Sequence, residues 1–276
     1  MFGQTQNIVR RHIALPSDHG AWVFLFSPLL IGIFAGGTWT VATTYLFVGV
    51  LAAFLLRQPL SMVVKIFSGR RSRRDLPAAW FWSIGYSLIT LLALTGLLLH
   101  GYQYLFILAL PGILVFTWHL YLVSLRAERR QLGVELIGSG VLALTAPAAF
   151  WVGTGWPDPL GWWLFALVWL QSAASIVHAY MRLGQRSLPE IPNIPTRLQI
   201  GRRALIYTSF NLVIVTAFSL TTHLPAFLPA AYLVQWVETV WGTLRPAVGF
   251  KPTAIGLRQL LVSSLFTIIF ILTWTG

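Results

Sequence analysis

The stretch QSAASIVHAYMRLGQR, residues 171–186, continues an apolar run that begins at Trp162 and then ends that run in positive charge. His178, Arg182 and Arg186 follow one another at intervals of four residues, so in a helix all three lie on one face. A helix that is apolar for most of its length and basic at one end is typical of a segment that leaves a membrane on its charged side. The stretch therefore predicts a membrane protein, with the basic end either anchored among lipid headgroups or lining a pocket below the membrane surface.

The composition of the chain agrees with a membrane protein. Of the 276 residues, 57% are hydrophobic and 9% are charged, whereas an average soluble domain has about 25% charged residues. Cysteine is absent, which excludes disulfides, thiol catalysis and zinc–thiolate sites. We assign the net charge of +12 to topology and anionic lipid, and we do not expect nucleic acid as a partner. We predict no cleavable signal peptide, because the N-terminal residues before the first apolar segment are polar.

Apolar segments of roughly 20 residues, the length that crosses a bilayer, recur along the chain. We predict an all-α polytopic membrane protein, a bundle of about nine transmembrane helices forming a single transmembrane domain over residues 1–276. The predicted segments are 21–36, 39–56, 78–99, 102–125, 134–153, 160–179, 204–220, 226–241 and 255–273. The eighth carries Glu238, and a re-entrant or interfacial helix is the alternative for it. Small residues predict a close helix contact in the fifth segment, at Gly133, Gly138, Gly140 and Ala143.

The basic residues indicate which connections share a side of the membrane. All 19 Lys and Arg residues precede the first segment or follow an even-numbered one. The positive-inside rule therefore places the N-terminus in the cytosol and the C-terminus outside. The predicted cytosolic loops, residues 57–77, 125–133, 181–203 and 242–254, include the longest connections, and long loops often carry function. We expect a multi-pass protein of a prokaryotic plasma membrane, with a thylakoid-type membrane as the alternative.

A second basic row has the spacing of the first. The run RQPLSMVVK, residues 57–65, ends the second segment on the same predicted side. Two helices that present cations to one cavity form an anion site without a metal, because Arg binds phosphate through two parallel hydrogen bonds and Lys adds a point charge. We therefore predict that the two rows converge on an anionic headgroup; the alternative is that both rows only meet lipid at the membrane surface. The predicted binding residues are Arg57, Ser61, Lys65, His178, Arg182 and Arg186.

Four further residues are assigned to the polar rim of this site: His19, Glu128, Arg129 and Glu135. Glu135 lies about one turn inside the fifth segment, where a lone carboxylate is costly. We expect it to form a salt bridge with an Arg of another helix, with a proton-carrying or substrate-contacting role as the alternative. We predict no metal site or cofactor, since His119 and His178 have no second ligand at the spacing that metal sites use, and no residue is identified as catalytic.

Five motifs together resemble the YwiC-like family of integral membrane proteins. They are PSDHGAW, RQPL, ERRQLGVELIG, VHAYMRLGQR and IGLRQLLVSSLF, which begin at residues 16, 57, 128, 177 and 255. The resemblance extends over essentially the whole chain and implies an integral membrane protein without an established activity.

The predicted topology is also similar to the UbiA superfamily of prenyltransferases. That resemblance implies acidic motifs after the second and sixth segments, where carboxylates hold Mg²⁺ against a prenyl diphosphate. The corresponding positions here are Arg57, Gln58, Ser61 and Lys65, and then His178 and Arg182. Because a cation cannot ligate Mg²⁺, we do not expect a standard Mg-dependent prenyltransferase.

These observations predict a protein that binds an isoprenoid or anionic lipid at a metal-independent basic site on the cytosolic side. A further hypothesis is that it also processes this lipid. The expected partners are membrane lipids, including an isoprenoid phosphate, and a membrane protein. The alternatives are a non-catalytic structural or assembly subunit of a membrane complex and a small-molecule permease. Against the permease we count the absence of an inverted repeat and of a mid-membrane charge pair in the sequence.

Overall fold

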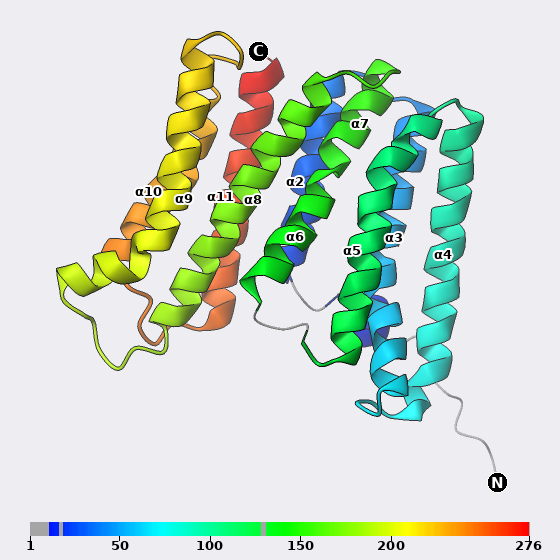
Figure 1. Cartoon of the computed structure of the whole chain (residues 1–276), viewed down its shortest axis with the longest axis horizontal. Coiled ribbons are helices and arrows are strands. Elements are labelled where there is room, and N and C mark those ends of the chain that lie inside the picture. The colour runs from blue at the N-terminus through cyan, green and yellow to red at the C-terminus, as the bar shows by residue number, and fades with distance from the viewer. Residues whose placement is uncertain (1–10, 17–18, 128–130, 276) are drawn as a thin grey trace.

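The protein is described by a computed structural model that covers residues 11–16, 19–127 and 131–275, without the side chains of Arg11 and His19. Over these residues the chain is all-helical and has no strand. Its helices run side by side between two ends of the molecule (Figure 1). The prediction of an all-α polytopic membrane protein is confirmed.

Each predicted segment coincides with a helix or a pair of helices. The long helices are α2 (His19–Gly36), α3 (Val41–Phe67), α4 (Leu76–Leu99), α5 (Phe106–Ser124), α6 (Leu132–Ala143), α7 (Thr145–Thr154), α8 (Leu160–Gln185), α9 (Ile194–Leu220), α10 (Pro229–Leu244) and α11 (Pro252–Thr275). The short ones are α1 (Arg11–Ala14), η1 (Arg73–Asp75) and η2 (Gln103–Leu105).

Fewer helices than the predicted nine meet both the length and the composition expected of a transmembrane helix. Within the described residues, 7 spans are long and apolar enough to cross a membrane, with α6 and α7 counted together. α2 has 18 residues and α10 has 16, and neither is among the seven. Both nevertheless run alongside the longer helices (Figure 1).

The fifth segment is interrupted rather than continuous. Pro147 has no N–H to donate to the carbonyl of Ala143, four residues earlier, and the ring would crowd that carbonyl. The helix accordingly ends at Ala143, and α7 begins at Thr145. α7 packs against α2 and α8.

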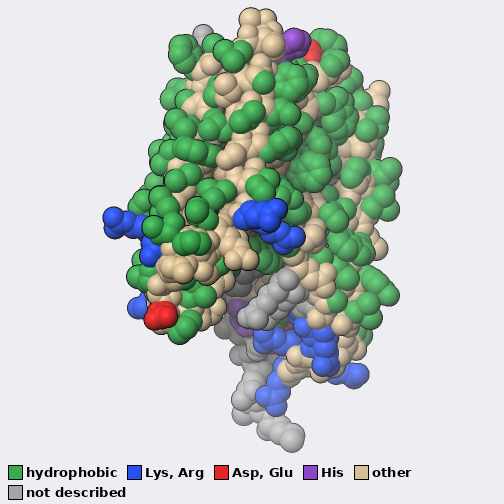
Figure 2. Space-filling model, turned by 60° about the vertical axis from the view of Figure 1, so that its left-hand side comes forward, with side chains coloured by type: hydrophobic (Ala, Val, Ile, Leu, Met, Phe, Trp, Pro, Cys, Tyr) green, Lys and Arg blue, Asp and Glu red, His purple; other side chains and the backbone are tan. Residues whose placement is uncertain are grey.

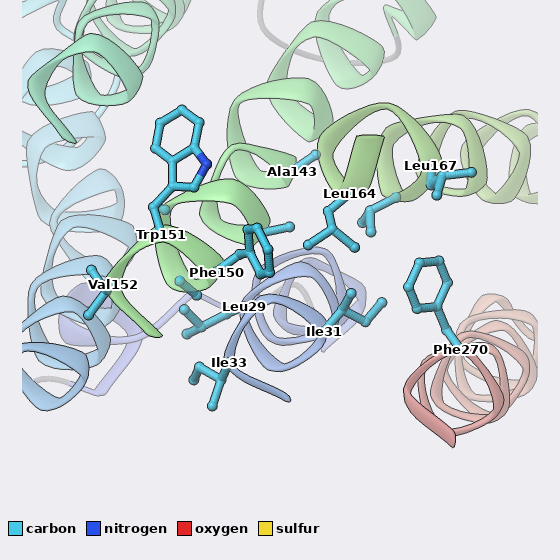
Figure 3. Packing of buried hydrophobic residues seen from close by; sticks show 14 of the residues in the cluster. Leu29, Ile31, Ile33, Ala143, Phe150, Trp151, Val152, Leu164, Leu167 and Phe270 are labelled. Atoms are coloured by element: carbon cyan, nitrogen blue, oxygen red, sulfur yellow. The ribbon is translucent and has the colours of Figure 1, made fainter. Parts of the chain in front are cut away.

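The main hydrophobic core surrounds α2, which packs against α6, α7, α8 and α11. Figure 3 shows Leu29 and Ile31 of α2 close to Phe150 of α7, with Phe270 of α11 in the same buried cluster. α2 and α7 approach closely because Gly32, in the middle of α2, has no side chain. A Cβ on Gly32 would collide with the backbone carbonyl of Ala146.

The basic connections lie together at one end of the molecule. Figure 1 shows α3–α4, α8–α9 and α10–α11 joined at the lower end, where α5 also ends and α6 begins. It shows α2–α3, α4–α5, α7–α8 and α9–α10 joined at the upper end. On the face drawn in Figure 2, Lys and Arg side chains lie from about mid-height downward, and none lies near the upper end. The predicted segregation of charge is therefore present in the structure. That the basic end faces the cytosol remains a prediction of the positive-inside rule.

Candidate functional site

A pocket of about 360 Å³ lies between α8, α10 and α11, toward the basic end of the bundle. This volume is within the roughly 300–1,000 Å³ that ligand pockets occupy. The polar lining residues are His178, Arg182, Glu238, Arg258 and Gln259, and the apolar ones are Phe250, Ala254, Ile255, Leu257 and Leu261. Leu257 and Leu261 are largely exposed on the surface of α11, so the pocket opens sideways, toward the lipid that surrounds a membrane protein.

An ion pair between Glu238 and Arg258 lies at the mouth of the pocket. Arg258 donates from Nε to Glu238 Oε1 at 2.6 Å and from Nη2 to Glu238 Oε2 at 2.8 Å. The Glu238 side chain is 9% exposed and the Arg258 side chain 44% exposed, so the carboxylate lies inside and the guanidinium at the mouth. A carboxylate within a membrane segment needs such a partner. The guanidinium also stacks on Trp241, with its carbon 3.6 Å from the ring centroid.

His178 lies deeper, next to a network of uncharged polar side chains. Its Nδ1 is 3.2 Å from Thr239 Oγ1, and its Nε2 is 3.8 Å from Glu238 Oε1, beyond hydrogen-bond distance. Gln259 of α11 donates to Ser175 of α8 at 2.7 Å and to Gln235 of α10 at 2.8 Å. This network fixes the three helices at the depth of the pocket.

Arg182 is used to hold α10 rather than to face the pocket mouth. It is 2% exposed, and its Nη1 donates to the carbonyls of Gly242 at 2.8 Å and Arg245 at 2.7 Å, and to Gln185 Oε1 at 3.0 Å. The last carbonyls of a helix have no partner within it and carry partial negative charge. The Arg182 guanidinium therefore caps the C-terminus of α10.

Arg186, the next member of this row, holds the connection that follows α10. Its Nε donates to the Phe250 carbonyl at 3.2 Å, and its own carbonyl accepts from Gly249 N at 3.3 Å. Of the first predicted row, His178 and Arg182 line the pocket and Arg186 fixes the α10–α11 connection.

The structure does not bring the second predicted row to this pocket. Arg57, Ser61 and Lys65 lie on α3, which packs mainly on α4, with α5, α7 and α1 as further neighbours. Within the described residues, no side chain of α3 lines the pocket. The Arg57 guanidinium carbon instead lies 5.9 Å from the Phe54 ring centroid. The predicted convergence is corrected for a physical reason: a four-residue spacing defines a helix face but does not determine which neighbour that face meets.

The predicted rim residues are only partly described. The side chain of His19, and all of Glu128 and Arg129, lie outside the described residues. Glu135 is exposed on α6 and accepts a hydrogen bond from the Tyr180 hydroxyl at 2.7 Å. Its observed partner in the described part of the chain is thus a tyrosine of α8, where an Arg was expected.

The sequence prediction missed the pairing of Glu238 with Arg258. The available signal was that a carboxylate in the eighth segment requires a cation at a similar depth, and Arg258 is the only basic residue inside the ninth segment. Among the residues that the structure describes, no three or more His, Cys, Asp and Glu side chains gather in a group that could hold a metal ion.

Comparisons with known proteins support the family resemblance. The family model described as YwiC-like protein matches residues 15–150. A Bacillus subtilis (strain 168) protein, described as uncharacterized protein YwiC, is 27% identical over 161 residues, which cover 58% of this chain and 61% of that protein. No solved structure matches the chain significantly, so the likeness to the UbiA superfamily stays a prediction. The pocket residues follow residue 150 and lie outside the family match. Over residues 15–150 the chain is thus similar to the YwiC-like family, and its long apolar helices are those of a multi-pass integral membrane protein.

Proposed function

We propose that this protein binds a phosphate-bearing membrane lipid in the pocket between α8, α10 and α11. The observation that carries the proposal is the position of Arg258, a half-exposed guanidinium at the mouth of a sideways-opening pocket. A guanidinium has five N–H donors, and two of them go to Glu238, which leaves three directed elsewhere. Arg is suited to phosphate because its planar fork matches two phosphate oxygens.

The apolar lining supports a lipid rather than a free anion. Leu257 and Leu261 follow one another at four-residue spacing along α11 and are exposed at the pocket. A hydrocarbon chain that leaves the pocket along this face contacts leucine instead of water. Both an acyl chain and an isoprenoid chain satisfy this requirement, so a phospholipid and an isoprenoid phosphate are the two sources of the same headgroup chemistry.

This proposal retains the predicted metal-independent contact between phosphate and arginine but changes the residues that make it. Arg258 takes the place assigned to the α3 row, and Arg182 supports the site by capping α10. Binding of this kind does not require a divalent ion, so addition of EDTA to the purified protein is expected to leave the bound lipid in place.

Native mass spectrometry of the protein purified in mild detergent tests the proposal. The wild-type chain should retain a phosphate-bearing lipid, and Arg258→Gln should reduce the retained fraction about tenfold, because a charge-assisted hydrogen bond contributes roughly 1.5–3 kcal/mol. Arg258→Lys keeps the charge beside Glu238 but loses the planar fork, and it should retain an intermediate amount. Arg202→Gln, at an exposed arginine of α9, is the matched control and should behave as wild type.

Two outcomes would contradict the proposal. The first is wild-type protein that carries no phosphate-bearing lipid and takes none up when it is added back. The second is equal retention by wild type and Arg258→Gln while both melt at the same temperature, since Arg258 would then have no contact with the lipid.

A further inference from the structure

The pocket presents its two charges in a fixed order from the mouth inward. The Arg258 side chain is 44% exposed and comes first, and the Glu238 side chain is 9% exposed and comes second. Arg182, the other cation in the lining, is already engaged by the C-terminal carbonyls of α10. A headgroup that enters from the lipid side therefore meets a positive charge and then a negative one.

The ion pair can bind a ligand without being broken. Each carboxylate oxygen has two acceptor sites, and Arg258 uses one site on each oxygen of Glu238. The guanidinium carbon also lies 3.6 Å from the centroid of the Trp241 ring, and this contact holds the guanidinium in place. The pair thus offers donors at its outer end and acceptors at its inner end at the same time.

We propose that the lipid bound here has a zwitterionic headgroup of the phosphoethanolamine type, with a phosphate next to its tails and a primary amine at its end. This inference rests on the proposed function and names the class of lipid. In such a headgroup the phosphate lies nearer the hydrocarbon chains and meets Arg258 at the mouth. The terminal ammonium reaches further in and donates to Glu238.

The same order of charges disfavours other phospholipid headgroups. A phosphoglycerol or a simple phosphate ester places nothing positive beside Glu238, so the free acceptor sites of that carboxylate gain no ion-paired donor. A phosphocholine carries the positive charge, but its three methyl groups leave no N–H to donate to Glu238. The chemistry therefore selects the primary amine over both alternatives.

The test uses the delipidated full-length protein and four synthetic lipids with identical acyl chains. The lipids are phosphatidylethanolamine, phosphatidylcholine, phosphatidylglycerol and phosphatidic acid, each titrated separately with binding followed by native mass spectrometry. The wild-type protein should bind phosphatidylethanolamine about tenfold more tightly than any of the other three, which corresponds to one ion-paired hydrogen bond. This panel needs no variant, so it decides the matter even where a substitution prevents insertion.

A variant then tests whether Glu238 is the residue that binds the ammonium group of the lipid. Glu238→Gln keeps the shape and one acceptor oxygen but removes the charge, and it should reduce the preference for phosphatidylethanolamine over phosphatidylglycerol from about tenfold to about equal. Glu190→Gln, at an exposed carboxylate near the same end of the bundle, should keep the full preference.

The outcomes separate this inference from the proposed function. If wild type binds phosphatidylglycerol or phosphatidic acid as tightly as phosphatidylethanolamine, or if Glu238→Gln keeps the tenfold preference, the amine is not recognised and the inference fails, while the phosphate proposal stands. If wild type binds none of the four lipids and retains no isoprenoid phosphate, both fail together.

Discussion

At the scale of single residues, Arg182 shows how a charged side chain becomes structural. It belongs to a basic row that the spacing of residues 171–186 reveals, yet its partners are the backbone carbonyls of Gly242 and Arg245 and the amide oxygen of Gln185. Every residue has a backbone carbonyl, so the order of side chains in the sequence does not show which carbonyls will accept a hydrogen bond from a distant arginine. The sequence could therefore predict that this arginine leaves the membrane beside His178, but not that it ends inside the bundle as the cap of another helix.

This role gives a prediction about stability. Arg182→Met keeps much of the side-chain volume but removes the donor to the Arg245 carbonyl and leaves the Gly242 carbonyl with Gln185 Nε2 at 3.1 Å. An unsatisfied buried acceptor costs about 1–3 kcal/mol. We expect the free energy of unfolding to fall by about 1–3 kcal/mol, measured as a lower melting temperature in detergent. Arg202→Met makes the same substitution at an exposed site and should melt as wild type. If Arg182→Met melts normally and instead loses its lipid, Arg182 is the headgroup ligand that the spacing first predicted.

At the scale of helices, the closest contact in the core is the crossing of α2 with α7. Gly32 and Gly36 lie one turn apart on α2, and a Cβ on Gly36 would be 3.0 Å from the Phe150 carbonyl oxygen and 3.1 Å from Gly153 Cα. Small residues four apart allow such an approach in a membrane. The sequence prediction placed its small-residue contact in the fifth segment, which does contain α7. It omitted the glycines of the partner helix. A Cβ on Gly133 or Gly138 would meet nothing within 4 Å, whereas a Cβ on Gly140 would be 3.0 Å from the Trp169 ring of α8.

The crossing can be tested with a single methyl group. Gly32→Ala introduces a Cβ against the Ala146 backbone, and such overpacking typically costs about 1–3 kcal/mol. Gly85→Ala makes the same change within α4, where a Cβ meets nothing within 4 Å, and better helix propensity should make it neutral or stabilising by up to about 1 kcal/mol. Thermal unfolding of both variants beside wild type measures the difference. Equal melting temperatures for the two variants would mean that α2 and α7 are further apart than described.

At the scale of the whole molecule, the fold was predictable from the sequence. The length of each apolar segment and the charge of the connections beside it constrain every segment in the same way. The apolar runs that define α3, α4 and α8, among others, are long enough to be read directly, and a missed span would have moved every later basic loop to the wrong end. The pocket was less predictable. It depends on which helices become neighbours, and the sequence does not say that α8 meets α10 and α11 while α3 packs mainly on α4.

The orientation of the molecule is the last prediction, and the absence of native cysteine makes it testable by labelling single introduced cysteines. Gln103 and Ser187 are exposed at opposite ends of the bundle, and Thr253, at the start of α11, lies at the same end as Ser187. The positive-inside rule predicts that Gln103→Cys reacts with a membrane-impermeant maleimide in intact cells, whereas Ser187→Cys and Thr253→Cys react only after permeabilisation. The reverse labelling pattern would show that the protein has the opposite orientation in the membrane. Labelling of Thr253→Cys from outside, with Ser187→Cys still protected, would instead show that α10, with 16 residues, does not cross the membrane.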